Sequence, residues 1–253
     1  MTRFSKILFF ADSLSANLRL YSLAHILFRA VGFARVVLLT WILEQTQFGL
    51  LSVGLAFVNI TAAIVLLGAP SALERYIPLY QNTDRLKAFL RRIIPVCLAI
   101  VVLGLVLLAL NIDFISSLVF SLTSFGPADP QTTHQFSQLT AACIAAVLAA
   151  ACFHMLVSCL KGLRFFRAVA AVELTHALLF TALAVALLLG YLRQPVVVLS
   201  AQALSMAVTA GILGILLLLS LRSSTEQNQA LASSAYLSRF SAFAVWGLPG
   251  TIT

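Results

Sequence analysis

Residues 20–43, LYSLAHILFRAVGFARVVLLTWIL, form one long apolar stretch that nevertheless carries two arginines, Arg29 and Arg35. About 20 apolar residues are enough for a helix to cross the hydrocarbon core of a bilayer. Each arginine near the centre of such a helix costs roughly 2.5–3.5 kcal/mol on insertion scales, so buried cations of this kind usually face a cavity or a partner. The stretch therefore predicts a membrane helix that lines a polar pathway.

The composition of the whole chain agrees with a membrane protein. Hydrophobic residues make up 61% of the 253 residues and charged residues only 9%, whereas a typical soluble domain has roughly 25% charged residues. The net charge of +8 would suggest nucleic-acid binding in a soluble protein. Here the basic residues alternate with apolar stretches instead of gathering on one face, so no nucleic-acid partner is expected.

Five further apolar stretches have the length of a membrane span, and an all-α bundle follows because lipid-exposed backbone groups must bond within their own segment. Ten-residue alternating segments, which are typical of membrane barrels, are absent from the sequence. We expect a lead-in at the cytoplasmic face or interface (1–19), a six-helix lobe (20–221), a cytoplasmic linker (222–239) and the truncated start of a seventh span (240–253). The six spans are expected near 20–43, 48–67, 93–110, 139–160, 174–192 and 195–221, with an interfacial helix near 114–122.

The loop charges predict the orientation of these spans. Most lysines and arginines precede span one, follow spans two and four, or follow span six, whereas the opposite loops contain Arg193 with Glu44, Asp113 and Asp129. Because lysine and arginine near span ends favour the cytoplasm, we expect a cytoplasmic N-terminus and an even number of complete crossings.

Polar residues inside the spans supply the candidate binding site. Helical spacing places His154, Ser158 and Lys161 on one face of span four, and Gln202, Ser205 and Thr209 on one face of span six. If these faces converge with the two arginines, they line a hydrated cavity of net positive charge. The candidate substrate-binding residues are Arg29, Arg35, His25, Asn59, His154 and Gln202.

Each of these residues also has a structural explanation. Serine, threonine and asparagine in membrane helices often make only interhelical hydrogen bonds, worth about 0.6 kcal/mol on average. His25 and His154 are also explained as satisfied core histidines, and Lys161 and Glu173 as side chains that reach toward the interface. Arginine keeps its proton, so a purely structural role for Arg29 and Arg35 requires a buried acid, for which only Glu173 is suitably placed.

Chemistry of other kinds has little support in the sequence. Glu173 and His176 have a spacing that metal sites use, but no second pair accompanies them, and we expect no metal or cofactor. The four cysteines form no CxxC pair, and neighbours within one helix are too far apart for a disulfide, so they are interpreted as small packing residues. No HExxH, DxD or GxSxG motif occurs, and an enzyme is not expected.

Two segments resemble a known group of transporters. FRAVGFARVV (28–37) resembles the first span of the lipid II flippases, and QFGLLSVGLAFVNITAAIVLLGAPSALERYIPLYQNTDRLKAFLRR (47–92) resembles the lipid-linked oligosaccharide flippases of the polysaccharide biosynthesis (O-antigen exporter) family. Both belong to one superfamily, which also includes the multidrug and toxin extruders. The resemblance covers about residues 20–95, and LPGTIT at the end of the chain is similar to the start of that family's seventh span.

The resemblance implies one lobe of a two-lobed, alternating-access transporter in the bacterial cytoplasmic membrane. It implies that Arg29 and Arg35 hold the diphosphate of a polyprenyl-linked glycan, and that a missing C-terminal lobe or a second half completes the protein among the membrane lipids. The acid that follows the second arginine in lipid II flippases is Val36 here, which argues against lipid II itself. The alternatives are a multidrug or cation extruder of the same superfamily and an inactive half-transporter fragment.

Overall fold

A computed structural model describes residues 14–81, 86–111, 130–190 and 194–222 of the chain. All regular structure within these ranges is helical, and six of the helices are long and apolar enough to cross a bilayer, so the predicted all-α membrane bundle is confirmed. The predicted interfacial helix (114–122) and the start of the seventh span (240–253) lie outside the described residues, as do residues 1–13 of the lead-in and 223–239 of the linker. The helices are α2 (Leu14–Ile42), α3 (Gln45–Leu66), α4 (Ala69–Gln81), α5 (Leu86–Leu110), α7 (Pro130–Gly162), α8 (Phe166–Gly190) and α9 (Pro195–Arg222).

The membrane-spanning parts of these helices differ from the predicted spans mainly in the first residue of span three and of span five. Span three begins at Ala88 and span five at Phe166, both earlier than the hydropathy pattern suggests. A helix continues through charged residues such as Arg91 and Arg92 because its backbone hydrogen bonds do not depend on side-chain hydropathy. The six spans are Tyr21–Ile42, Gln45–Leu66, Ala88–Leu110, Gln138–Gly162, Phe166–Gly190 and Pro195–Ile215.

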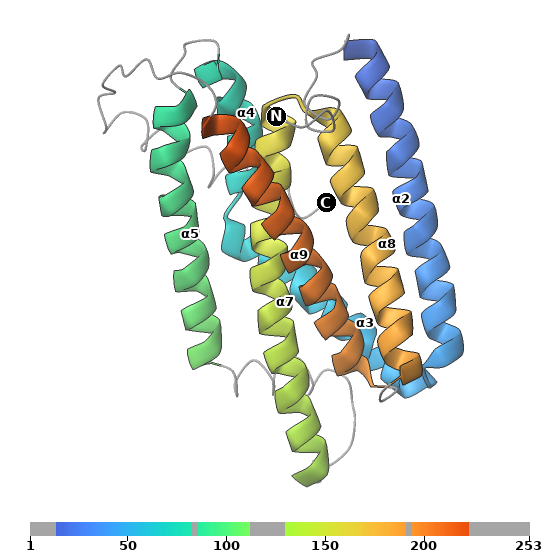
Figure 1. The fold of residues 1–253 in the computed structure, drawn as a ribbon. Coiled ribbons are helices and arrows are strands. Elements are labelled where there is room, and N and C mark those ends of the chain that lie inside the picture. The colour runs from blue at the N-terminus through green and yellow to red at the C-terminus, as the bar shows by residue number, and fades with distance from the viewer. Residues whose placement is uncertain (1–13, 82–85, 112–129, 191–193, 223–253) are drawn as a thin grey trace.

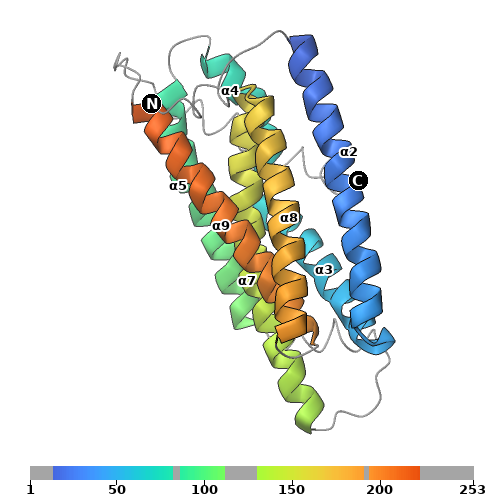
Figure 2. The same ribbon diagram turned by 45° about the vertical axis from the view of Figure 1, so that its right-hand side comes forward.

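Helix α7 occupies the centre of the bundle and packs against α9, α3 and α4 (Figure 1). Helix α2 lies at the edge and packs mainly on α8, as the turned view in Figure 2 also shows. Successive long helices run in opposite directions, so the start of α2, all of α4, the start of α5 and the end of α7 meet at one end of the bundle. We call it the cation-rich end, after Arg19, Arg75, Arg91, Arg92, Lys161, Arg164 and Arg167.

The break between α3 and α4 lies near this end. Leu67 caps α3 with a φ of 46°, its N–H donates to the Ile64 carbonyl at 3.1 Å, and Gly68 follows with a φ of 70°. Left-handed residues of this kind end helices, and glycine adopts the conformation without strain. The next helix therefore leaves in a new direction and packs against α7.

Small side chains let α7 pack closely against its neighbours. Ala146, Ala150 and Ala151 have no exposed surface, and the thiol of Cys143 approaches the Gly54 carbonyl of α3 at 3.9 Å. Close approach over small residues is how membrane helices gain packing energy, since lipid supplies no hydrophobic drive between them. All four cysteines are free thiols, as their interpretation as packing residues predicts.

Candidate functional site

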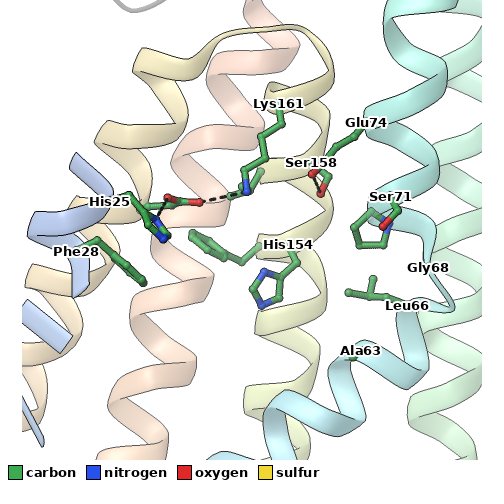
Figure 3. A pocket seen from close by; sticks show the side chains of 14 residues that line it. His25, Phe28, Ala63, Leu66, Gly68, Ser71, Glu74, His154, Ser158 and Lys161 are labelled. Atoms are coloured by element: carbon green, nitrogen blue, oxygen red, sulfur yellow. Dashed lines mark hydrogen bonds and ion pairs between the residues drawn. The ribbon is translucent and has the colours of Figure 1, made fainter. Parts of the chain in front are cut away.

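A pocket of about 400 Å³ lies between α2 and the α3–α4 junction, with α7 behind it. Figure 3 shows its polar side chains pointing toward one another from α2, α4, α7 and α8. The pocket belongs to the half of the bundle near the cation-rich end, because the end of α3, the start of α4 and the last turns of α7 form it. Its lining comprises His25, Phe28, Ala63, Leu66, Gly68, Pro70, Ser71, Glu74, Phe153, His154, Val157, Ser158, Lys161 and Glu173.

Glu173 of α8 joins three helices on one side of this pocket. Its Oε1 lies 3.5 Å from Lys161 Nζ of α7, and its Oε2 lies 3.9 Å from His25 Nδ1 of α2. The Glu173 side chain is only 15% exposed, so the bundle keeps most of it away from solvent. His25 Nδ1 is itself buried and makes no hydrogen bond, and Glu173 Oε2 is the carboxylate atom that lies within 4 Å of it.

Glu74 of α4 forms a second polar contact across the pocket. Ser158 Oγ of α7 donates a hydrogen bond to Glu74 Oε1 at 3.0 Å. Ser158 is buried, whereas Glu74 is exposed at the rim. His154, Ser158 and Lys161 all line the pocket, as the predicted polar face of span four requires.

The charge of this pocket differs from the sequence-based expectation. One lysine faces two glutamates in the lining, so with neutral histidines the pocket is not net positive. The predicted spans leave Glu74 between span two (48–67) and span three (93–110), outside the membrane. The break at Leu67 and Gly68 turns α4 back onto α7 and makes Glu74 part of the pocket.

Arg29 and Arg35 do not line this pocket. Arg29 is exposed on α2, and the Arg35 guanidinium lies 4.2 Å from the ring centroid of Phe180 of α8. Among the described residues, no carboxylate lies within 4 Å of either guanidinium. A Cβ atom added to Gly32 would lie 3.9 Å from Arg35 Nη2, so the glycine leaves space beside that group. Glu173, the acid that a structural role would need, is instead paired with Lys161.

The other candidate residues divide between the pocket and the packed interior. His25 and His154 line the pocket, whereas Asn59 is exposed elsewhere on α3. Gln202 is buried in α9 and its Oε1 makes no hydrogen bond. Of the six candidate residues, the structure brings only the two histidines together in the described pocket.

The polar face of α9 makes contacts inside the bundle. Ser205 Oγ lies 3.2 Å from His176 Nδ1 of α8, and Ser205 and Thr209 also donate to carbonyls of their own helix. This geometry is the interhelical hydrogen bond that was considered for Ser205, and His176 is not among the residues that line the pocket. The part of the chain that the structure describes holds no cluster of three His, Cys, Asp or Glu side chains suited to a metal ion.

The arrangement offers two kinds of binding chemistry on adjacent parts of α2. The pocket presents donors and acceptors of both charges over apolar walls, and the two arginines present permanent cations one or more turns deeper in the span. Comparison with other proteins adds no assignment, since no protein-family model, curated protein or solved structure matches the chain.

Proposed function

We propose that the chain is the N-terminal lobe of a transporter that moves polyprenyl-diphosphate-linked oligosaccharides across the bacterial cytoplasmic membrane for cell-surface polysaccharide synthesis. In this proposal the cation-rich end of the bundle faces the cytoplasm, in keeping with the preference of lysine and arginine for that side. The resemblance of residues 20–95 to oligosaccharide flippases supports the substrate class. The structural support comes from the depth and surroundings of the two arginines.

The observation that carries the proposal is the pair of guanidinium groups near the middle of a membrane span without a carboxylate partner. At about 1.5 Å per residue, Arg29 and Arg35 lie within roughly 5 Å of the midpoint of the Tyr21–Ile42 span. Neither has a carboxylate within 4 Å among the described residues. A planar guanidinium binds phosphate oxygens bidentately, and such charge-assisted bonds are strongest where water is excluded. A diphosphate would therefore stabilise both side chains.

The position of α2 supports access for a lipid-linked substrate. Only one side of α2 packs on the bundle, and Phe33, Leu38 and Trp41 are exposed on it. A second lobe placed against this region would enclose the arginines in a shared cavity, while the polyprenyl tail stayed in lipid. Rocking of two lobes around a site near the midplane is the usual mechanism of such transporters.

Binding of a bare polyprenyl diphosphate tests the proposal without requiring the second lobe. The full chain in lipid nanodiscs should bind it, and Arg29→Ala and Arg35→Ala should each weaken binding about tenfold or more, because a hydrogen bond to a charged group contributes about 1.5–3 kcal/mol. Arg91→Ala, which removes an exposed arginine of α5, is the matched control and should leave the affinity unchanged. Unchanged affinity in the Arg29→Ala/Arg35→Ala double variant would contradict the proposal.

A cation extruder of the same superfamily is the second candidate, and the two pocket carboxylates favour it. Glu74 and Glu173 would attract an organic cation, although Lys161 lies 3.5 Å from one of them and opposes it. Tetraphenylphosphonium distinguishes the two functions. Tight binding that Glu74→Gln removes, together with no binding of polyprenyl diphosphate, would favour the extruder.

A further inference from the structure

The pocket between α2 and α4 has a chemistry of its own, distinct from that of the arginines. Its volume of about 400 Å³ falls in the range of small-molecule sites, about 300–1,000 Å³. It has room for a ligand of one or two rings. Four helices contribute polar side chains to it, so its shape depends on the fold and not on one flexible loop.

Hydrogen-bonding capacity of both kinds remains in the pocket after its internal contacts are made. Lys161 has three donors, of which one approaches Glu173, and Glu74 accepts from Ser158 through one of its two oxygens. A ligand that both donates and accepts would satisfy these groups better than one that does only one of the two.

The charges of the lining disfavour an anion, and Lys161 partly offsets the attraction of the two carboxylates for a cation. A phosphate or carboxylate in the pocket would lie beside Glu74 and Glu173, and a cation would lie beside the Lys161 ammonium. A neutral ligand with several hydroxyl groups meets neither repulsion. Phe28 and Phe153 add flat apolar surfaces, against which the C–H faces of a sugar ring can pack.

The pocket also lies at a suitable place relative to the arginines. Arg29 follows the pocket residue His25 by four residues, about 6 Å along the axis of α2. A ligand with a sugar attached directly to a diphosphate spans a separation of this order. We propose that the pocket binds the neutral sugar nearest the diphosphate of a lipid-linked glycan. This inference rests on the proposed function and adds the sugar site to it.

Three probes separate this inference from the proposed function. They are a bare polyprenyl diphosphate, the same lipid carrying one glucose, galactose or N-acetylglucosamine, and octyl glucoside below its micellar concentration, which has no diphosphate. Binding is measured on the full chain in nanodiscs. At least one neutral sugar should raise the affinity of the diphosphate lipid about tenfold, and a glucuronic acid in its place should not.

Glu74→Gln should abolish the gain from the sugar while leaving the affinity for the bare diphosphate lipid unchanged. Glu44→Gln is the matched control, because Glu44 is an exposed glutamate at the opposite end of the bundle and makes no side-chain capping bond. Arg29→Ala should weaken both diphosphate lipids equally and leave octyl glucoside binding intact. Glu74→Gln keeps the size of the side chain, and Ser158→Ala, which removes the donor instead, should reduce the gain in the same way.

The outcomes separate the two proposals. If no neutral sugar improves binding, or if Glu74→Gln leaves the improvement intact, the sugar site is wrong even where bare diphosphate binds as proposed. If octyl glucoside binds in a Glu74-dependent manner and bare diphosphate does not bind, the sugar site stands and the diphosphate role of the arginines fails. Tetraphenylphosphonium binding that depends on Glu74, without any effect of sugar, would assign the pocket to cations and overturn the inference.

Discussion

Helices α2 and α7 are both membrane spans, but they differ in what surrounds them. In the most apolar part of each span, 67% of the residues of α7 are buried and 6% of those of α2. The polar side chains of α7 meet partners from α4 and α8, whereas the arginines of α2 meet no carboxylate among the described residues. The polar residues of α7 thus have partners inside the bundle, whereas the arginines of α2 lack a carboxylate partner among the described residues.

The largest expected difference in stability is between two variants that replace an alanine with leucine, one in each helix. Ala150 in α7 has no exposed surface, and Ala30 in α2 is exposed. Ala150→Leu should lower the free energy of unfolding by about 1–3 kcal/mol because the close-packed centre cannot accommodate the extra atoms. Ala30→Leu should change it by no more than about 0.5 kcal/mol. Unfolding by steric trapping in bicelles measures both, and equal losses would contradict the contrast between the two helices.

Two glycines that end helices allow a second comparison of stability, one at a close contact and one in open space. Gly162 ends α7, and a Cβ added to it would lie 2.9 Å from Cβ of Ile77 in α4, whereas nothing lies within 4 Å of the corresponding point at Gly190, which ends α8. Gly162→Ala should cost about 1 kcal/mol through this clash. Gly190→Ala should lie within about 0.5 kcal/mol of the parent chain in the same measurement. A neutral Gly162→Ala would show that α4 does not pack this closely on α7.

Double-mutant cycles at Glu173 compare its couplings to α7 and α2. The Lys161–Glu173 pair at 3.5 Å should show a coupling of up to about 1 kcal/mol, because the pair is partly exposed and solvent screens it. The His25–Glu173 pair should couple by less than about 0.5 kcal/mol, because its atoms are 3.9 Å apart and the His25 side chain is 41% exposed. Lys161→Met, His25→Gln and Glu173→Gln provide the cycles. A stronger coupling to His25 would mean that α2 is held as firmly as α7.

The smallest expected effect on stability is at Arg29. Since this side chain is exposed and has no ion-pair partner among the described residues, Arg29→Gln should change the free energy of unfolding by no more than about 0.5 kcal/mol. The same variant should lose affinity for polyprenyl diphosphate. A stability loss above about 1 kcal/mol would assign Arg29 a structural role and weaken its proposed role in binding.

The sequence predicted the number and positions of the spans well but the site only in part. A long run of apolar residues marks the part of a helix that crosses the bilayer, so hydropathy located the six spans. It does not report which side of the helix faces a neighbour, because lipid-facing and buried residues are both apolar. The face shared by His154, Ser158 and Lys161 was found by helical spacing, and the contact of Ser205 with His176 is the interhelical hydrogen bond that was the alternative to a cavity role. Glu74 was missed because its approach to Ser158 depends on a change of chain direction that composition does not reveal.

The two left-handed residues Leu67 and Gly68 determine that Glu74 lies in the pocket between α2 and α4. An uninterrupted α3 would carry Glu74 about 12 Å past Leu66 along the same line, away from the serine that now donates to it. The charge of the pocket therefore depends on backbone conformation as well as on which side chains the sequence supplies. Replacing Gly68 would therefore change ligand binding in the pocket without removing any of its polar side chains.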